Sequence, residues 1–180
     1  MTWMDLGVVL LVVAYAAIGY YSGIIRRVLG VAVLYLAFWV ATNMGAKGGD
    51  MIVQARPSLA VQDARILAFF GFVLLVVVVV ESMATAYHDL LQVSVVALNR
   101  ASGVLVGLLT GIAAATLAVY LLGAASNPPG GGPDVLQARI KDSVTNSALS
   151  RPLLKSAGPS VLFLFRPVVP YNPQVYFEKD

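Results

Sequence analysis

Four long apolar stretches constrain this chain more than any other feature of its sequence. They cover about residues 4–22, 28–46, 66–86 and 101–125. Each approaches the roughly 20 residues that an α-helix needs to cross the hydrocarbon core of a bilayer. The third stretch contains the valine run 76–80, but a lone strand in lipid would leave its backbone unpaired. The sequence therefore predicts an all-α polytopic membrane protein with about four transmembrane helices.

Composition agrees with a chain that is solvated largely by lipid. Hydrophobic residues make up 59% of the chain and charged residues only 12%, whereas soluble domains carry about 25% charged residues. The net charge is +3, and the basic residues form no stripe with interleaved aromatic residues. The bilayer is therefore the expected partner, and no nucleic acid is expected.

The residue types that build metal and catalytic sites are scarce. The chain has no cysteine, and His88 is its single histidine. Its acidic residues are scattered rather than paired. A zinc site or a Ser-His-Asp triad would have to use His88. We therefore expect no metal, no cofactor and no enzymatic activity.

The N-terminal apolar stretch could be a cleaved signal peptide or a retained first span. Residues 14–16 fit a small-x-small cleavage pattern, but no Lys or Arg precedes the stretch, and Asp5 lies near its start. Signal peptides begin with a positively charged segment. We therefore expect a retained first helix.

The connections between the stretches differ in character. Residues 23–27 form a tight basic link, which predicts an antiparallel hairpin of the first two helices. Residues 47–65 predict a loop with a short helix. Residues 85–99 are amphipathic at helical spacing, and two interpretations remain open: a helix in the membrane interface, or an extension of the third span.

The sequence after residue 125 predicts a separate tail. Prolines and glycines in residues 126–133 indicate a flexible linker, which divides a transmembrane domain of residues 1–125 from a helical tail of residues 134–180. The apolar run 161–165 is too short to span a bilayer. The proline-rich end, residues 167–180, is expected to be extended.

The basic residues indicate an orientation only weakly. With four spans, three arginines fall on one side, namely Arg26, Arg27 and Arg100. Three basic residues fall on the other side, at positions 47, 56 and 65. The compact pair at 26 and 27 favours a cytoplasmic location for its side. The N-terminus and the tail are then expected outside the cytoplasm.

Three segments of the chain resemble the colicin V production protein family of bacterial inner-membrane proteins. The first combines residues 4–6 (MDL) with residues 19–27 (GYYSGIIRR), and the second is residues 98–107 (LNRASGVLVG). The third, a weaker match, is the polar stretch 147–152 in the tail. The motif residues that carry the resemblance include Arg26, Asn99 and Arg100. We interpret the Asn99–Arg100 pair as a helix cap followed by a cytoplasmic anchor.

The resemblance implies a bacterial inner-membrane accessory protein linked to toxin production or export and to envelope integrity, with no firmly assigned reaction. Family members often have basic residues just before the Asn-Arg pair, whereas this chain has His88, Asp89 and Gln92 there. That departure weakens any expectation of anionic-lipid binding at this segment. Some relatives continue into an extracytoplasmic serine protease, an activity that we do not carry over to this chain.

Glycines recur at helical spacing in two of the predicted spans. Gly103, Gly107 and Gly111 lie along one face of the fourth span, and Gly19 and Gly23 form a smaller pair. Small residues at this spacing let another helix approach closely. Packing within the chain is the preferred interpretation, and homo-oligomerisation is the alternative.

Glu81 lies within the third apolar stretch, where a carboxylate is costly. The preferred interpretation is an ion pair with one of the arginines of the Arg26 side, or a place among the headgroups. The functional alternative is a proton or ion relay with Thr85 and His88, which follow at i+4 and i+7.

These observations predict a non-enzymatic accessory or scaffold protein of the membrane. One alternative is a small oligomeric channel or transporter component in which Glu81 lines a path. The other is a membrane anchor that positions an extracytoplasmic protein partner, such as a peptidase, through residues 134–180.

Overall fold

The computed structural model describes residues 2–86, 96–126, 135–169 and 172–177, and every regular element in them is helical. The elements are α1 (Trp3–Ala55), α2 (Val61–Ala86), α3 (Val96–Ala125), α4 (Val135–Thr145), α5 (Ser150–Ser156), α6 (Gly158–Phe165) and the short 3-10 helix η2 (Pro173–Phe177). Four segments among the described residues are long and apolar enough to cross a bilayer, namely Trp3–Ile24, Val28–Ala55, Val61–Met83 and Asn99–Ala125. The predicted all-α architecture with four spans is confirmed.

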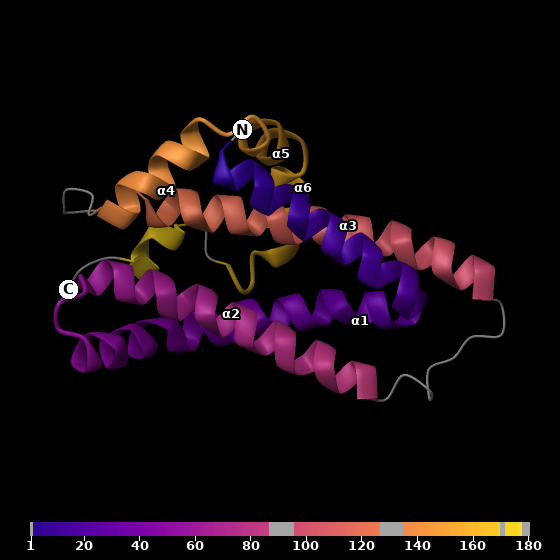
Figure 1. The fold of residues 1–180 in the computed structure, drawn as a ribbon, viewed down its shortest axis with the longest axis horizontal. Helices are drawn as coiled ribbons and strands as arrows, with labels where there is room; N and C mark the ends of the chain where they lie inside the picture. Colours follow the sequence, from indigo (N-terminus) through magenta and orange to yellow (C-terminus); the bar gives the residue numbers. More distant parts are fainter. Residues whose placement is uncertain (1, 87–95, 127–134, 170–171, 178–180) are drawn as a thin grey trace.

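The first helix folds back on itself at a single glycine (Figure 1). Gly23 has φ 74° and ψ 178°, and glycine adopts a positive φ without steric cost. The break divides α1 into a first arm, residues 3–22, and a second arm, residues 24–55. The predicted hairpin is present, and one residue makes its turn.

The expectation of a loop over residues 47–65 is wrong for most of that range. The second arm stays helical to Ala55, and α2 begins at Val61. Gly48 and Gly49 do not break the helix because they face α2: a methyl group on Gly49 would lie 2.6 Å from the Arg65 side chain. Arg65 also lies 3.6 Å from the Asp50 carboxylate. Close packing against α2 therefore outweighs the low helix propensity of glycine.

The glycine ladder of α3 packs against the first arm. A methyl group on Gly103 would overlap the backbone of Gly19, and one on Gly107 would overlap the carbonyl oxygen of Tyr15. One on Gly111 would lie 2.9 Å from the Cα atom of Val12. The two backbones are thus so close that no side chain larger than a hydrogen atom fits between them. The glycine face of α3 therefore packs against the first arm of the same chain.

The tail shares a core with the spans. Phe165 and Phe177 are fully buried; the Phe165 ring lies 6.2 Å from that of Phe38 in the second arm, and the Phe177 ring lies 5.7 Å from that of Phe69 in α2. The described parts of the tail and of the spans therefore share one core, and most of the predicted linker, residues 126–133, lies outside the described residues.

The described residues of the segment 167–180 are not extended, contrary to the expectation, and residues 170–171 and 178–180 lie outside the described part of the chain. Residues 166–169 form turns, and residues 173–177 form η2. The Thr42 hydroxyl donates to the carbonyl oxygen of Val168 over 3.0 Å. Short-range turns and this bond satisfy backbone groups that an extended segment inside the helix bundle would leave unpaired.

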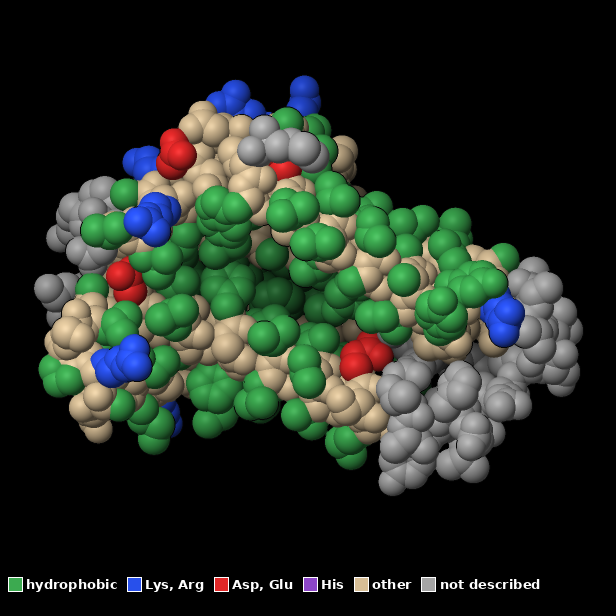
Figure 2. Space-filling view, viewed as in Figure 1, with side chains coloured by type: hydrophobic (Ala, Val, Ile, Leu, Met, Phe, Trp, Pro, Cys, Tyr) green, Lys and Arg blue, Asp and Glu red, His purple; other side chains and the backbone are tan. Residues whose placement is uncertain are grey.

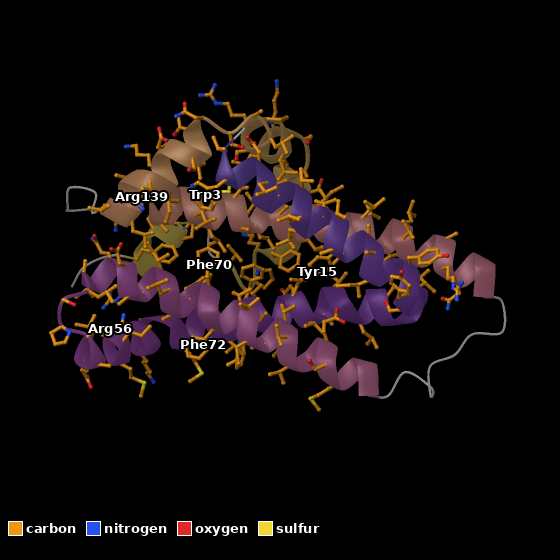
Figure 3. The ribbon with its side chains drawn as sticks, viewed as in Figure 1. Trp3, Tyr15, Arg56, Phe70, Phe72 and Arg139 are labelled. Carbon is orange, nitrogen blue, oxygen red and sulfur yellow. The ribbon has the colours of Figure 1, made fainter. Side chains whose placement is uncertain are left out.

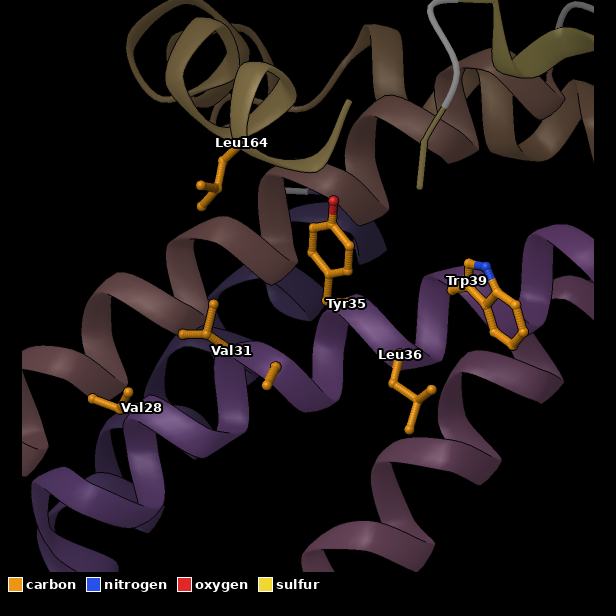
Figure 4. A pocket seen from close by; sticks show the side chains of 7 residues that line it. Val28, Val31, Tyr35, Leu36, Trp39 and Leu164 are labelled. Atoms are coloured by element: carbon orange, nitrogen blue, oxygen red, sulfur yellow. The ribbon is translucent and has the colours of Figure 1, made fainter. Parts of the chain in front are cut away.

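The sixth helix reaches the apolar middle of the second arm. Leu164 lines a pocket of about 620 Å³ together with Val31 and Tyr35 (Figure 4). Tyr35 precedes Lys47 by 12 residues, or about 18 Å of helix, which corresponds to the centre of a hydrocarbon core about 30 Å thick. The tail therefore extends along the spans to the depth of the bilayer interior.

The surface has the polarity of a membrane protein. Figure 2 shows apolar side chains over the middle of the visible face, with most of the charged side chains around its margins. Tyr21, Leu74 and Phe163 are large apolar side chains with 78%, 65% and 78% of their surface exposed. Such exposure is unfavourable in water and favourable in lipid.

Replacing Gly107 by alanine should lower the free energy of unfolding by about 1–3 kcal/mol, because the new methyl group forces the first arm and α3 apart. Thermal unfolding followed by circular dichroism in detergent measures the effect. Gly7→Ala is the matched control, because no atom lies within 4 Å of a methyl group at Gly7. Equal stability of the two variants would contradict the close approach.

Candidate functional site

The two motifs at residues 19–27 and 98–107 meet at one end of the bundle. The Ile24 amide, which begins the second arm, donates to the Asn99 side-chain oxygen over 2.9 Å. The Asn99 amide also lies directly against Gly23, where any side chain would overlap it. Asn99 thus caps a helix, but the capped helix is the second arm of α1, 75 residues away in sequence, rather than its own.

Arg100 and Arg26 flank this junction. The Arg100 guanidinium lies 5.5 Å from the ring centre of Tyr20, a distance that allows a cation–π interaction. Arg26 lies in α1 three residues after Gly23, and its side chain is not among those described. The predicted helix start after Asn99 is corrected, because α3 already begins at Val96.

A second polar junction ties the start of the chain to the tail. The Asp5 carboxylate is 1% exposed and accepts hydrogen bonds from the Ser147 hydroxyl over 2.6 Å and the Leu149 amide over 3.1 Å. It also accepts from the Thr2 amide over 2.8 Å, as part of a capping box. The Ser147 oxygen in turn accepts from the Ser150 amide over 2.9 Å. The segments at 4–6 and 147–152, both of which carry the family resemblance, thus meet in space.

A third tie connects α4 with α2. The Gln137 side-chain amide donates to the Gln62 side-chain oxygen over 2.9 Å, and both side chains are buried. A buried amide pair of this kind is costly to break, because each partner would lose its hydrogen bond without regaining water.

Glu81 lines an apolar pocket between the first arm and α2. The pocket has a volume of about 340 Å³, and its lining includes Tyr15, Ile18 and Val77; Tyr15 lies in the space between the helices (Figure 3). Glu81 is half-buried and follows Arg65 by 16 residues, about 24 Å along α2. Thr85 lies one turn further along α2, but its side chain is not described, and His88 lies outside the described residues. The relay therefore stays a prediction for which Glu81 alone is located.

The polar groups of these junctions hold helices together. Asp5 and Asn99 use their oxygens to satisfy backbone amides and a hydroxyl of distant segments. Within the described residues, no group of three His, Cys, Asp or Glu side chains could hold a metal ion. The arrangement fixes the relative position of the spans and the tail.

Sequence reasoning missed the partners of Asp5, although a signal was present. An acidic residue at the start of an apolar span is costly unless it is satisfied, and the tail offers polar residues at 147–150 that could satisfy it. The partnership of Tyr20 with Arg100 and of Gln62 with Gln137 had no signal in the sequence, because such pairs depend on helix rotation.

Replacing Asn99 by leucine should lower the free energy of unfolding by about 1–3 kcal/mol, because the Ile24 amide loses its acceptor. Amide hydrogen exchange at Ile24, read by mass spectrometry of the peptide that contains it, should become faster. Asn99→Asp keeps an acceptor oxygen and should retain slow exchange, whereas equally fast exchange in both variants would contradict the capping role.

Comparison with known proteins adds one finding. The model of the family described as colicin V production protein matches residues 4–159, which include all three segments that carry the resemblance. No curated protein and no solved structure matches the chain significantly. Because the family model covers most of the sequence, this four-span membrane protein belongs to the colicin V production protein family.

Proposed function

We propose that this protein is a non-enzymatic accessory or scaffold protein of a bacterial inner membrane, acting in toxin production or export and in envelope integrity. Its family membership supports the setting. The observation that carries the scaffold role is the anchoring of the tail: Asp5 binds Ser147 and Leu149, 142 and 144 residues away in sequence. A tail held in this way presents a fixed surface to a partner.

The exposed side of the tail suits a protein partner. Four basic side chains of α4 and α5 are exposed, namely Arg139, Lys141, Arg151 and Lys155, and Asp142 is the exposed acid beside them. Charged patches of this kind steer association with a partner of opposite charge. The partner that we propose is therefore a soluble extracytoplasmic protein with an acidic surface.

A structural use of the polar groups supports a role without catalysis. The Asp5 carboxylate and the Asn99 amide are engaged with backbone groups that the fold must satisfy. Replacing either would first damage the fold, which is the expected behaviour of a positioning residue.

A transport role is the second candidate, and Glu81 is the observation that favours it. This carboxylate lines the pocket between the first arm and α2, together with Tyr15, Ile18 and Val77. Ionisable residues within spans often mark ion or proton paths. A homo-oligomer would be needed to surround such a path, because Glu81 lies at a cleft between two helices rather than inside a closed channel.

The orientation that we propose places the Gly23 turn in the cytoplasm and both the N-terminus and the tail outside it. Arg26 and Arg27 follow the turn directly, and basic residues next to spans favour the cytoplasmic side. The tail carries six further basic residues, so the proposed orientation rests on the compact Arg26–Arg27 pair beside the turn and not on the total number of basic residues.

Single cysteines provide a clean test of the orientation, because the chain has no native cysteine. Ser58 and Ala148 are both exposed, and both lie at the end of the bundle opposite Gly23. Ser58→Cys and Ala148→Cys should therefore react with a membrane-impermeant maleimide on cells with a permeabilised outer membrane. Tyr21→Cys, at the Gly23 end, should react only after the inner membrane is opened. The reverse pattern would overturn the proposed orientation.

Photo-crosslinking in the native membrane tests the scaffold role. A photoreactive residue at exposed Ala138 or Ala148 should capture one dominant envelope protein, and one at lipid-exposed Leu75 should not. Asp5→Ala should weaken the capture by releasing the tail. Asp50→Ala, which removes an exposed carboxylate elsewhere, is its matched control. Self-crosslinks alone would contradict the scaffold role and favour the oligomeric alternative.

A further inference from the structure

A second apolar pocket lies where the tail meets the spans. It is an open groove with a volume of about 540 Å³, lined by residues from the first arm, α2, α3 and α4. Phe70, Gly71 and Leu74 form its α2 wall, and Leu122 of α3 and Ile140 of α4 lie opposite. The tail therefore supplies one wall of this open groove, and the spans supply the others.

The mouth of this pocket has the chemistry of a headgroup region. Arg139 and Trp3 both line it, and Figure 3 shows them close together at the tail end of the molecule, with Phe70 of α2 across from them. Arg139 is the single charged residue among the lining residues. Arginine binds phosphate through paired charge-assisted hydrogen bonds, and tryptophan favours the membrane–water interface.

The depth of the pocket matches one leaflet. Gly71 and Leu74 follow Arg65 by six and nine residues, so they lie about 9 and 13 Å along α2 from the charged end of that helix. Half of a hydrocarbon core is about 15 Å thick. An amphiphile with its polar group at Arg139 would thus place its chain along this α2 wall.

Gly71 shows that the pocket has room for such a chain. No atom lies within 4 Å of a methyl group built on Gly71, unlike the glycines of the ladder, which touch another backbone. The groove is lined by apolar side chains apart from Arg139 at its mouth. One apolar chain below one anionic group is the arrangement of a membrane lipid, and this match favours a lipid as the occupant.

We propose that this pocket is a binding site for a phospholipid of the surrounding bilayer, with its phosphate on Arg139 and one acyl chain against Gly71 and Leu74. The site holds the tail, the first arm and α2 around a common ligand. Arg139 is also one of the four exposed basic side chains of the tail, but lipid binding does not depend on the proposed protein partner and is tested on the purified protein alone.

Native mass spectrometry of the delipidated full-length protein in detergent tests the site, with phosphatidylglycerol and a diacylglycerol of the same chains as the two probes. Phosphatidylglycerol should bind with one-to-one stoichiometry and about tenfold more tightly than diacylglycerol, because only the former offers a charge-assisted bond to Arg139. Equal binding of the two probes would overturn the proposed phosphate contact.

Two variants separate the chain and phosphate contributions. Gly71→Leu should fill the pocket and weaken the binding of both probes. Arg139→Gln should remove the preference for phosphatidylglycerol over diacylglycerol. Leu75→Phe and Arg151→Gln are the matched controls, because neither residue lines the pocket, and both should bind as the wild type does. Unchanged binding by Gly71→Leu, at a melting temperature equal to that of the wild type, would overturn the site.

Discussion

The close approach of the first arm to α3 is the contact on which the rest of the structure depends. Gly19 lies against Gly103, and Tyr15 against Gly107, without intervening side chains. In lipid, such packing supplies the attraction between helices that the hydrophobic effect does not. It also sets the register in which Asn99 reaches the turn at Gly23. A larger residue in the ladder would therefore shift the cap as well as the helices.

The tail is the second determinant of the architecture. The first arm pairs with α3 and the second arm with α2, and tail residues such as Phe165 and Phe177 fill the space that these pairs leave between them. Ties at Asp5 and Gln62 hold it in place from two different helices. The extramembrane surface and the bilayer-facing pocket at Arg139 therefore belong to one packed unit, so that a ligand in the pocket and a partner on the tail would both act on the same core.

The spans could be predicted because the length of an apolar stretch decides whether it crosses a membrane. The glycine ladder of α3 could be predicted because its residues repeat at helical spacing within one helix. The partners could not be predicted from such patterns. The Ser147–Asp5 bond joins residues that are 142 positions apart, and its geometry depends on the path of every segment between them. Glycines at 48 and 49 indicate a loop in water, whereas here they allow α2 to approach the second arm. Proline-rich sequence indicates an extended end, whereas here buried turns satisfy much of their own backbone.

The cap at Gly23 has a consequence for how the chain is made. Synthesis delivers the Ile24 amide to the membrane long before Asn99 emerges, 75 residues later. The partner of Asp5 is synthesised later still, because Ser147 follows Asp5 by 142 residues. Until then these groups can be satisfied only by water and headgroups at the membrane surface, because hydrocarbon offers no hydrogen bonds. The first-made segment of the chain therefore gains its native partners among the last.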